Sequence, residues 1–184
     1  MKKTVLVLAL IILGFSFAAN SRRVKIEKKE LFKELKVKQT MYYTPIVFGL
    51  DYGVSNSIDV KGHKIYITAE EEESIRMEGC AELRVNTESL NARFVIDHKF
   101  NVVPYTMNAI GGKLKVNELA VDSDIIPINT TIFIGNENYK AKDTGKMIKN
   151  LHIDRFMGTM TPSEFKKKIR NFPDSITIKI KINE

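Results

Sequence analysis

The chain is poor in the residues that build disulfides and metal sites. Its 184 residues include one cysteine, Cys80, and three histidines, His63, His98 and His152. A single cysteine excludes an internal disulfide, so the stability of the fold has to come from packing. The histidines are far apart in the sequence and lack the spacing of zinc ligands, so we expect no metal and no other cofactor.

The sequence also lacks repeats, low-complexity segments and a basic stripe interleaved with aromatic residues. The net charge is +7 at pH 7, and the basic residues are scattered along the chain. Nucleic acid is therefore not an expected partner. A modest positive excess instead suits an anionic wall polymer or a membrane surface.

The first 19 residues have the composition of an export signal. Two lysines precede an apolar run from Val5 to about Phe17, and the small residues Ala18 and Ala19 follow. No cysteine comes directly after the apolar run, which argues against a lipoprotein anchor. An uncleaved anchor stays open, because the run is only slightly shorter than the roughly 17–25 residues that span a bilayer. We therefore expect an exported protein of the periplasm or cell envelope, with possible membrane attachment through this segment.

After the predicted signal, the composition of the sequence changes at Thr40. Residues 20–39 are highly charged, and Leu31, Phe32 and Leu35 are spaced as on a short amphipathic helix or stalk, the alternative being a solvated tether. From Thr40 onward, short runs rich in β-formers are separated by Gly, Asn, Asp and Pro, which predicts strands and turns. The predicted strands are 40–49, 63–68, 92–97, 100–107, 118–122, 130–136 and 139–143.

Helix signals occur at two places. Residues 70–83 contain good helix formers, although Gly79 interrupts them. Near the C-terminus, Thr161 can cap a helix that Pro162 begins, Glu164 occupies the capping-box position, and Pro173 ends it. The following segment, 175–182, alternates isoleucine with polar residues and predicts a half-buried strand. Many short strands with few helices indicate a closed or nearly closed β architecture.

Three aspartates stand at predicted strand ends or turns: Asp122, Asp143 and Asp154. Aspartate is common at turns because its side chain binds nearby backbone N–H groups, and Asp143 before Thr144 and Gly145 fits that structural role. Asp154 fits it least, because apolar neighbours predict a partly buried strand around it. Burial raises the pKa of a carboxyl group, so Asp154 is the candidate for a general acid.

The three aspartates lie in the stretches "LAVDSDIIPINTTIFI" and "YKAKDTGKMIKNLHIDRF", and "MYYTPIVFG" lies upstream of them. In this order, the three stretches resemble the 3D domain, which is named for three aspartates and occurs in bacterial cell-wall proteins, including MltA-type lytic transglycosylases. The resemblance covers residues 115–158 and 40–49. It implies a mainly β fold, a double-psi β-barrel, spanning residues 40–184 with a reduced insertion at about 50–114 and a short C-terminal helix plus strand.

The resemblance also implies a function. Lytic transglycosylases cleave the bond between N-acetylmuramic acid and N-acetylglucosamine of peptidoglycan and leave a 1,6-anhydro end. By position, Asp154 would be the acid and base, with Asp143 and Asp122 in support. The substrate would contact Tyr43, Thr44, Thr144 and Gly145. For Tyr42 and Tyr43 strand packing is the alternative role, and it should hold for one of them because neighbouring strand residues face opposite ways. His152 is given no role.

The chain departs from the family pattern at three glycines, which are Asn129, Lys146 and Asn150 here. Asparagine accepts left-handed backbone angles, so Asn129 is compatible with the fold. Lys146 and Asn150 make a second function possible, a wall-binding module of the same fold that holds glycan strands without cutting them. A three-carboxylate calcium site is a weaker alternative, because the Asx-rich loop of such sites is missing. The expected protein is a monomer.

Overall fold

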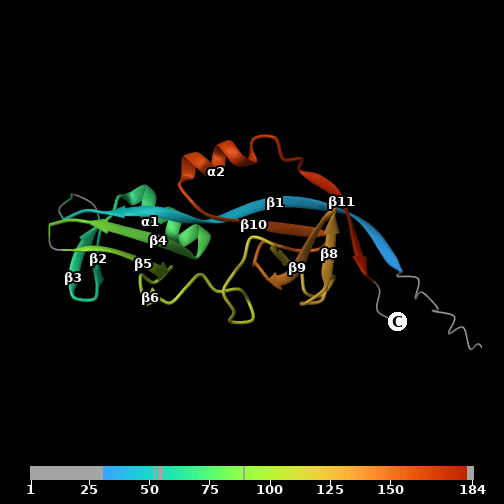
Figure 1. The fold of residues 1–184 in the computed structure, drawn as a ribbon, viewed down its shortest axis with the longest axis horizontal. Coiled ribbons are helices and arrows are strands. Elements are labelled where there is room, and N and C mark those ends of the chain that lie inside the picture. Colours follow the sequence, from blue (N-terminus) through green and yellow to red (C-terminus); the bar gives the residue numbers. More distant parts are fainter. Residues whose placement is uncertain (1–30, 52, 54–55, 89, 182–184) are drawn as a thin grey trace, which may run out of the picture.

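A computed structural model of the chain describes residues 31–51, 53, 56–88 and 90–181. The molecule is elongated and consists of two lobes, both of which contain part of the strand β1 (Phe32–Gly49) (Figure 1). The predicted export signal lies outside the described residues. Within the described residues, no helix is long and apolar enough to span a bilayer.

One lobe is a closed β-barrel. Its strands follow one another in the order β10, β7, β9, β8, β11 and β1, and a parallel pairing of β1 with β10 closes the ring. Closure leaves this sheet without exposed edges. The strands besides β1 are β7 (Glu118–Val121), β8 (Thr131–Ile134), β9 (Glu137–Asp143), β10 (His152–Met160) and β11 (Ser175–Lys181).

Every strand of the barrel contributes to its core. Alternating residues point inward, as the pleat of a strand requires. The side chains buried together are Val37, Leu119, Val121, Ile132, Tyr139, Ala141, Ile153 and Ile178 from the six strands, with Ile126 from the loop after β7. The predicted mainly β barrel is confirmed.

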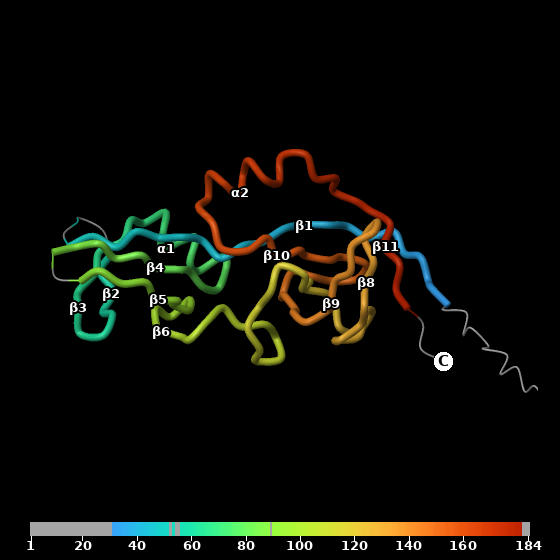
Figure 2. The backbone as a smooth tube through the Cα atoms, in the orientation of Figure 1, coloured from blue at the N-terminus to red at the C-terminus, as the bar shows by residue number. Residues whose placement is uncertain are grey.

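The second lobe is built around the far end of β1. There β1 pairs in parallel with β4 (Cys80–Asn86), which continues the sheet to β5 (Asn91–Asp97) and β6 (Val102–Val103). A hairpin of β2 (Ser57–Val60) and β3 (His63–Tyr66) packs on this sheet together with α1 (Ala69–Glu78). The segment 104–117 then leads the chain back to the barrel (Figure 2). This lobe occupies most of the insertion predicted at 50–114.

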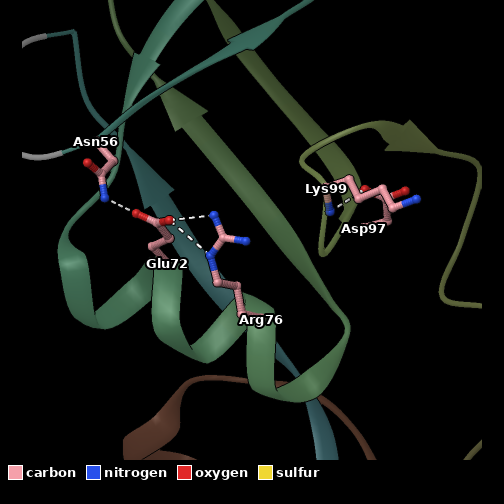
Figure 3. A network of polar contacts seen from close by, with 5 residues as sticks. All are labelled: Asn56, Glu72, Arg76, Asp97 and Lys99. Carbon is pink, nitrogen blue, oxygen red and sulfur yellow. Dashed lines mark hydrogen bonds and ion pairs between the residues drawn. The ribbon is translucent and has the colours of Figure 1, made fainter.

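Local sequence determines where α1 begins and ends. Thr68 and Glu71 form a capping box at its start, and Gly79 ends it in a left-handed conformation with φ of 81°. The predicted helix over 70–83 is therefore correct up to Glu78, and its last residues belong to β4. On the surface of α1, Glu72 binds both Asn56 and Arg76, which fixes the helix to the segment before β2 (Figure 3).

The prediction of a helix or tether for residues 20–39 is wrong over 32–39. These residues are the first half of β1 and pair antiparallel with β11, Leu35 opposite Ile178 and Val37 opposite Ile176. Leu35 and Val37 have the two-residue period of a strand, and burying them in the barrel outweighs the helix propensity of their charged neighbours.

The C-terminal helix and strand are both present, but the predicted end of the helix at Pro173 is wrong. Helix α2 (Pro162–Ile169) begins with the capping box of Thr161 and Glu164, although it ends at Ile169, before Pro173. Strand β11 alternates as predicted, with Ile178 completely buried. Helix α2 lies beside β1 near the middle of the molecule, where the two lobes meet (Figure 1).

Candidate active site

Three neighbouring barrel strands bring two of the predicted aspartates into one row. On β10, Asp154 is opposite Thr40 of β1 on one side and Ala120 of β7 on the other. On β9, Asp143 is also opposite Ala120. Residues in register across a sheet share a face, so Thr40, Asp154, Ala120 and Asp143 form a row, here called the acid row. It lies on the face of the barrel wall opposite to Ile153 and the core.

A β-bulge in β9 is what puts Asp143 into this row. Leu119 pairs with Ala141, but the next residue, Ala120, pairs with Asp143, so Lys142 is an extra residue on β9. Without it, Asp143 would stand one position further along and point to the other face. Between the two acids, Ala120 offers only a methyl group.

The Asp154 side chain is half-buried and poorly hydrogen-bonded. Its Oδ1 atom is buried without a hydrogen-bond partner among the described residues. Burial raises the pKa of Asp154 to about 6, the hydroxyl of Thr40 acts against that increase by hydrogen bonding to the carboxylate, and the charge of Asp143 adds to it. A carboxyl group of this kind keeps its proton to a higher pH than an ordinary aspartate.

Asp143 has more hydrogen-bond donors around it. The Tyr42 hydroxyl donates to Oδ2 at 2.7 Å, and the Thr144 N–H donates to Oδ1 at 3.0 Å. Burial raises the pKa of Asp143, while the bonds from Tyr42, Thr144 and the Ala109 backbone act against the increase. The Tyr42 ring packs on Phe156 with 5.3 Å between centroids, which fixes the hydroxyl in place. Sequence reasoning gave Tyr42 no site role. The available signal was that neighbouring strand residues face opposite ways, so Tyr42 and Tyr43 could not both face the site.

Asp122 has a different role from the other two aspartates. Its Oδ2 accepts the Asn150 N–H at 2.7 Å, and its Oδ1 accepts the Asp124 N–H at 3.3 Å. The Asn150 bond holds the pKa of Asp122 below its usual value. Asp122 thus ties the loop after β7 to the loop before β10, the structural role of a turn aspartate. We find no hydrogen bond from it to Asp143 or Asp154 among the described residues.

Tyr43 and Thr44 lie inside the molecule. Their exposed fractions are 7% and 1%, so their side chains do not form an accessible surface, contrary to the prediction that they line a substrate groove. The Tyr43 ring stacks on Phe165 of α2 at 4.1 Å, and Thr44 Oγ1 is 3.0 Å from Thr106 Oγ1. Of the two tyrosines, Tyr43 is the one used for packing, and Tyr42 faces the acids.

A carboxyl group from the other lobe completes the site. Glu78 is the last residue of α1, and its Oε2 accepts the Tyr43 N–H at 3.4 Å. Burial raises the pKa of Glu78 to about 7, the Tyr43 bond opposes this, and the charge of Asp154 raises it further. A helix C-terminus is also an unfavourable place for negative charge. Sequence reasoning missed Glu78, because only the packing of the two lobes brings it near Asp154.

The loop from Asp143 to Asn150 borders the acid row. Gly145 packs so closely that a Cβ atom there would lie 2.9 Å from Ile148 Cγ1, while Thr144 is exposed. Asn150 and Asn129, which replace family glycines, have φ of 59° and 73°. Both keep the left-handed angle that glycine would have, so these substitutions preserve the backbone.

Comparison with solved structures identifies the architecture. Escherichia coli MltA with bound chitohexaose matches with a TM-score of 0.58 and 10% identity over 80% of this chain and 72% of that one. MltA from Neisseria gonorrhoeae matches with a TM-score of 0.56 and 11% identity, over 82% of this chain and 75% of that one. The lytic transglycosylase LtgG of Burkholderia pseudomallei matches with a TM-score of 0.50 and 15% identity, over 80% of this chain and 71% of that one. This chain has the MltA fold.

The MltA fold confirms the resemblance predicted from the motifs. No family model and no curated protein sequence matches the chain, so the likeness rests on structure at 10–15% identity. Within the ranges that the structure describes, no group of three or more His, Cys, Asp or Glu side chains is arranged to hold a metal ion. What the site does contain is a set of half-buried acids whose pKa values are raised.

Proposed function

We propose that this protein is an exported peptidoglycan lytic transglycosylase in which Asp154 is both the acid and the base. The observation that carries the proposal is the state of Asp154, a half-buried carboxyl with an unpartnered Oδ1 among the described residues and a pKa raised to about 6. The MltA fold, whose solved examples include one with bound chitohexaose, supports a glycan as substrate.

In the proposed reaction, the protonated Asp154 donates its proton to the glycosidic oxygen as the bond to the muramic anomeric carbon breaks. The resulting carboxylate then takes the proton of the muramic 6-hydroxyl while that oxygen bonds to the anomeric carbon. Asp154 regains its proton, and no water is consumed. Most glycoside hydrolases divide such work between two carboxyls, whereas this route needs one residue at the reacting bond.

Other residues in and around the acid row have supporting roles in the proposal. Asp143, oriented by Tyr42, keeps negative charge beside Asp154 and so favours the protonated acid. Asp122 holds the two loops at the edge of the site together. The exposed Thr144 and the backbone at Gly145 border the place where a sugar would bind.

The test is digestion of peptidoglycan sacculi with the purified protein, followed by mass spectrometry of the released fragments. We expect 1,6-anhydromuropeptides, and an Asp154→Asn variant should release none. An Asp124→Asn variant, which changes an exposed aspartate near the same loops, should retain activity. Fragments with reducing ends would indicate a hydrolase instead. Sedimentation of the protein with intact sacculi, without release, would indicate the wall-binding module.

A further inference from the structure

The hydroxyl of Thr40 connects Asp154 to a histidine. Thr40 Oγ1 lies 2.9 Å from His152 Nε2. Thr40 is also directly opposite Asp154 in register, and hydrogen bonding with its hydroxyl affects the pKa of the Asp154 carboxyl. His152 and Asp154 are two positions apart on β10 and opposite Lys38 and Thr40 of β1, so all four side chains are on one face. The three groups therefore form a hydrogen-bonded chain from imidazole to hydroxyl to carboxyl.

A threonine hydroxyl has one proton to donate, and here it has two candidate acceptors. If Thr40 donates to His152 Nε2, its oxygen can only accept from Asp154, which requires the protonated acid. If Thr40 donates to Asp154, the carboxylate is stabilised, and Nε2 must either carry a proton itself or lose its bond. The protonation state of His152 thus determines which form of Asp154 the hydroxyl favours.

The surroundings of His152 favour a neutral ring. Burial and then the charge of Lys38 lower the pKa of His152, and a hydrogen bond with the Met147 backbone acts in the opposite direction. Since Nε2 is occupied by Thr40, Nδ1–H is the group left to donate to the Met147 carbonyl. A neutral imidazole with its proton on Nδ1 presents Nε2 as an acceptor.

We propose that His152 is a positioning residue for Asp154, acting through Thr40: the neutral imidazole accepts a hydrogen bond from the Thr40 hydroxyl, and the hydroxyl oxygen is left to accept one from the Asp154 acid. The charged and titratable groups that face Asp154 otherwise come from β9 (Asp143), β1 (Tyr42) and α1 (Glu78). The role in cleavage rests on the function proposed above, but the chain of hydrogen bonds does not.

The decisive measurement is a ¹³C NMR titration of the Asp154 carboxyl, assigned by its absence from Asp154→Asn. In His152→Leu, Thr40 is free to donate to the carboxylate, so the Asp154 midpoint should fall by about one pH unit. The fall should persist when Thr40→Ser is combined with His152→Leu, because serine keeps the hydroxyl. It should vanish in a Thr40→Val background. His98→Leu, a change at an exposed histidine of the other lobe, is the matched control.

An unchanged midpoint in His152→Leu, or an equal fall in the presence of valine at position 40, would overturn the proposal. A measurement on the unmodified protein guards against a variant that fails to fold. The ¹⁵N shifts of the His152 ring at pH 7 should show Nδ1 protonated and Nε2 bare, and a protonated Nε2 would contradict the proposed chain.

Activity gives a separate readout. A fall of one pH unit in the Asp154 midpoint changes the protonated fraction about tenfold at pH values above it. The rate of anhydromuropeptide release by His152→Leu should therefore fall about tenfold at pH 7.5 and remain unchanged near pH 4.5. If the unmodified protein releases no such product, the proposed function fails, and the NMR titration still tests the coupling through Thr40.

Discussion

Replacing Asp154 by asparagine should stabilise the fold at neutral pH. The folded state raises the pKa of Asp154 from 3.8 to about 6. A carboxyl whose pKa is raised on folding contributes stability below its unfolded pKa and loses it as the pH rises through the folded value. A pKa difference of about two between the folded and unfolded states corresponds to roughly 3 kcal/mol of unfolding free energy at pH values above 7.

Asparagine has nearly the same shape, can still hydrogen-bond the Thr40 hydroxyl and does not titrate. The free-energy difference between Asp154→Asn and the unmodified protein should therefore be small at pH 4 and grow by roughly 3 kcal/mol between pH 4 and 7.5. For a chain of this length that corresponds to about 5–10 °C in Tm.

Urea denaturation followed by circular dichroism, at half-unit steps from pH 4 to 8, measures this difference. Asp124→Asn is the control, because it makes the same chemical change at an exposed aspartate. A flat difference for Asp154→Asn across the whole range would refute the reasoning, because it would mean that folding does not perturb this carboxyl group.

Further predictions concern three other residues. Tyr42→Phe removes the donor to Asp143 Oδ2, a bond that lowers the pKa of Asp143, so NMR titration should show the pKa of Asp143 rising further. Glu78→Gln keeps an acceptor for the Tyr43 N–H but no charge, so urea unfolding should show it about 3 kcal/mol more stable than the unmodified protein above pH 8 and equal to it at pH 4. Asn150→Ala should lower the unfolding free energy measured by urea denaturation by about 1 kcal/mol, because alanine disfavours the left-handed backbone angle at this position. Asn150→Gly should not lower it, because glycine adopts that angle readily.

The barrel could be predicted because its sequence signals are local. Alternation in 175–182 and 139–143, and the capping box of Thr161 and Glu164, are short-range patterns that specify an element independently of the rest of the chain. The first half of β1 shows the opposite case. Its charged residues have good helix propensity, and only pairing with β11 and burial of Val37 make it a strand. That information lies more than 130 residues away in the sequence.

The site could be predicted only in part, because its geometry depends on register. The motif order gave Asp143 and Asp154, and the structure brings them together. The order of the motifs could not reveal the bulge that makes Lys142 an extra residue, nor that Tyr42 and not Tyr43 faces the acids. Glu78 and Thr40 reach Asp154 by packing of separate segments, and His152, two residues before Asp154 on β10, connects to it only through Thr40 of β1. No local pattern marks residues of that kind.

The hydrogen-bonding difference between the two acids favours cleavage over simple glycan binding. A binding site for hydroxyl-rich sugars works best with ionised carboxylates, which accept hydrogen bonds and are supported by donors of their own. Asp143 has such donors in Tyr42 and in the N–H groups of Thr144 and Ala109. Asp154 has one shared hydroxyl, a buried Oδ1 without a partner among the described residues, and negative charge from Asp143 beside it. Those surroundings penalise the carboxylate and leave the acid comparatively favoured, which is the condition under which a carboxyl group can donate its proton to a leaving oxygen near neutral pH.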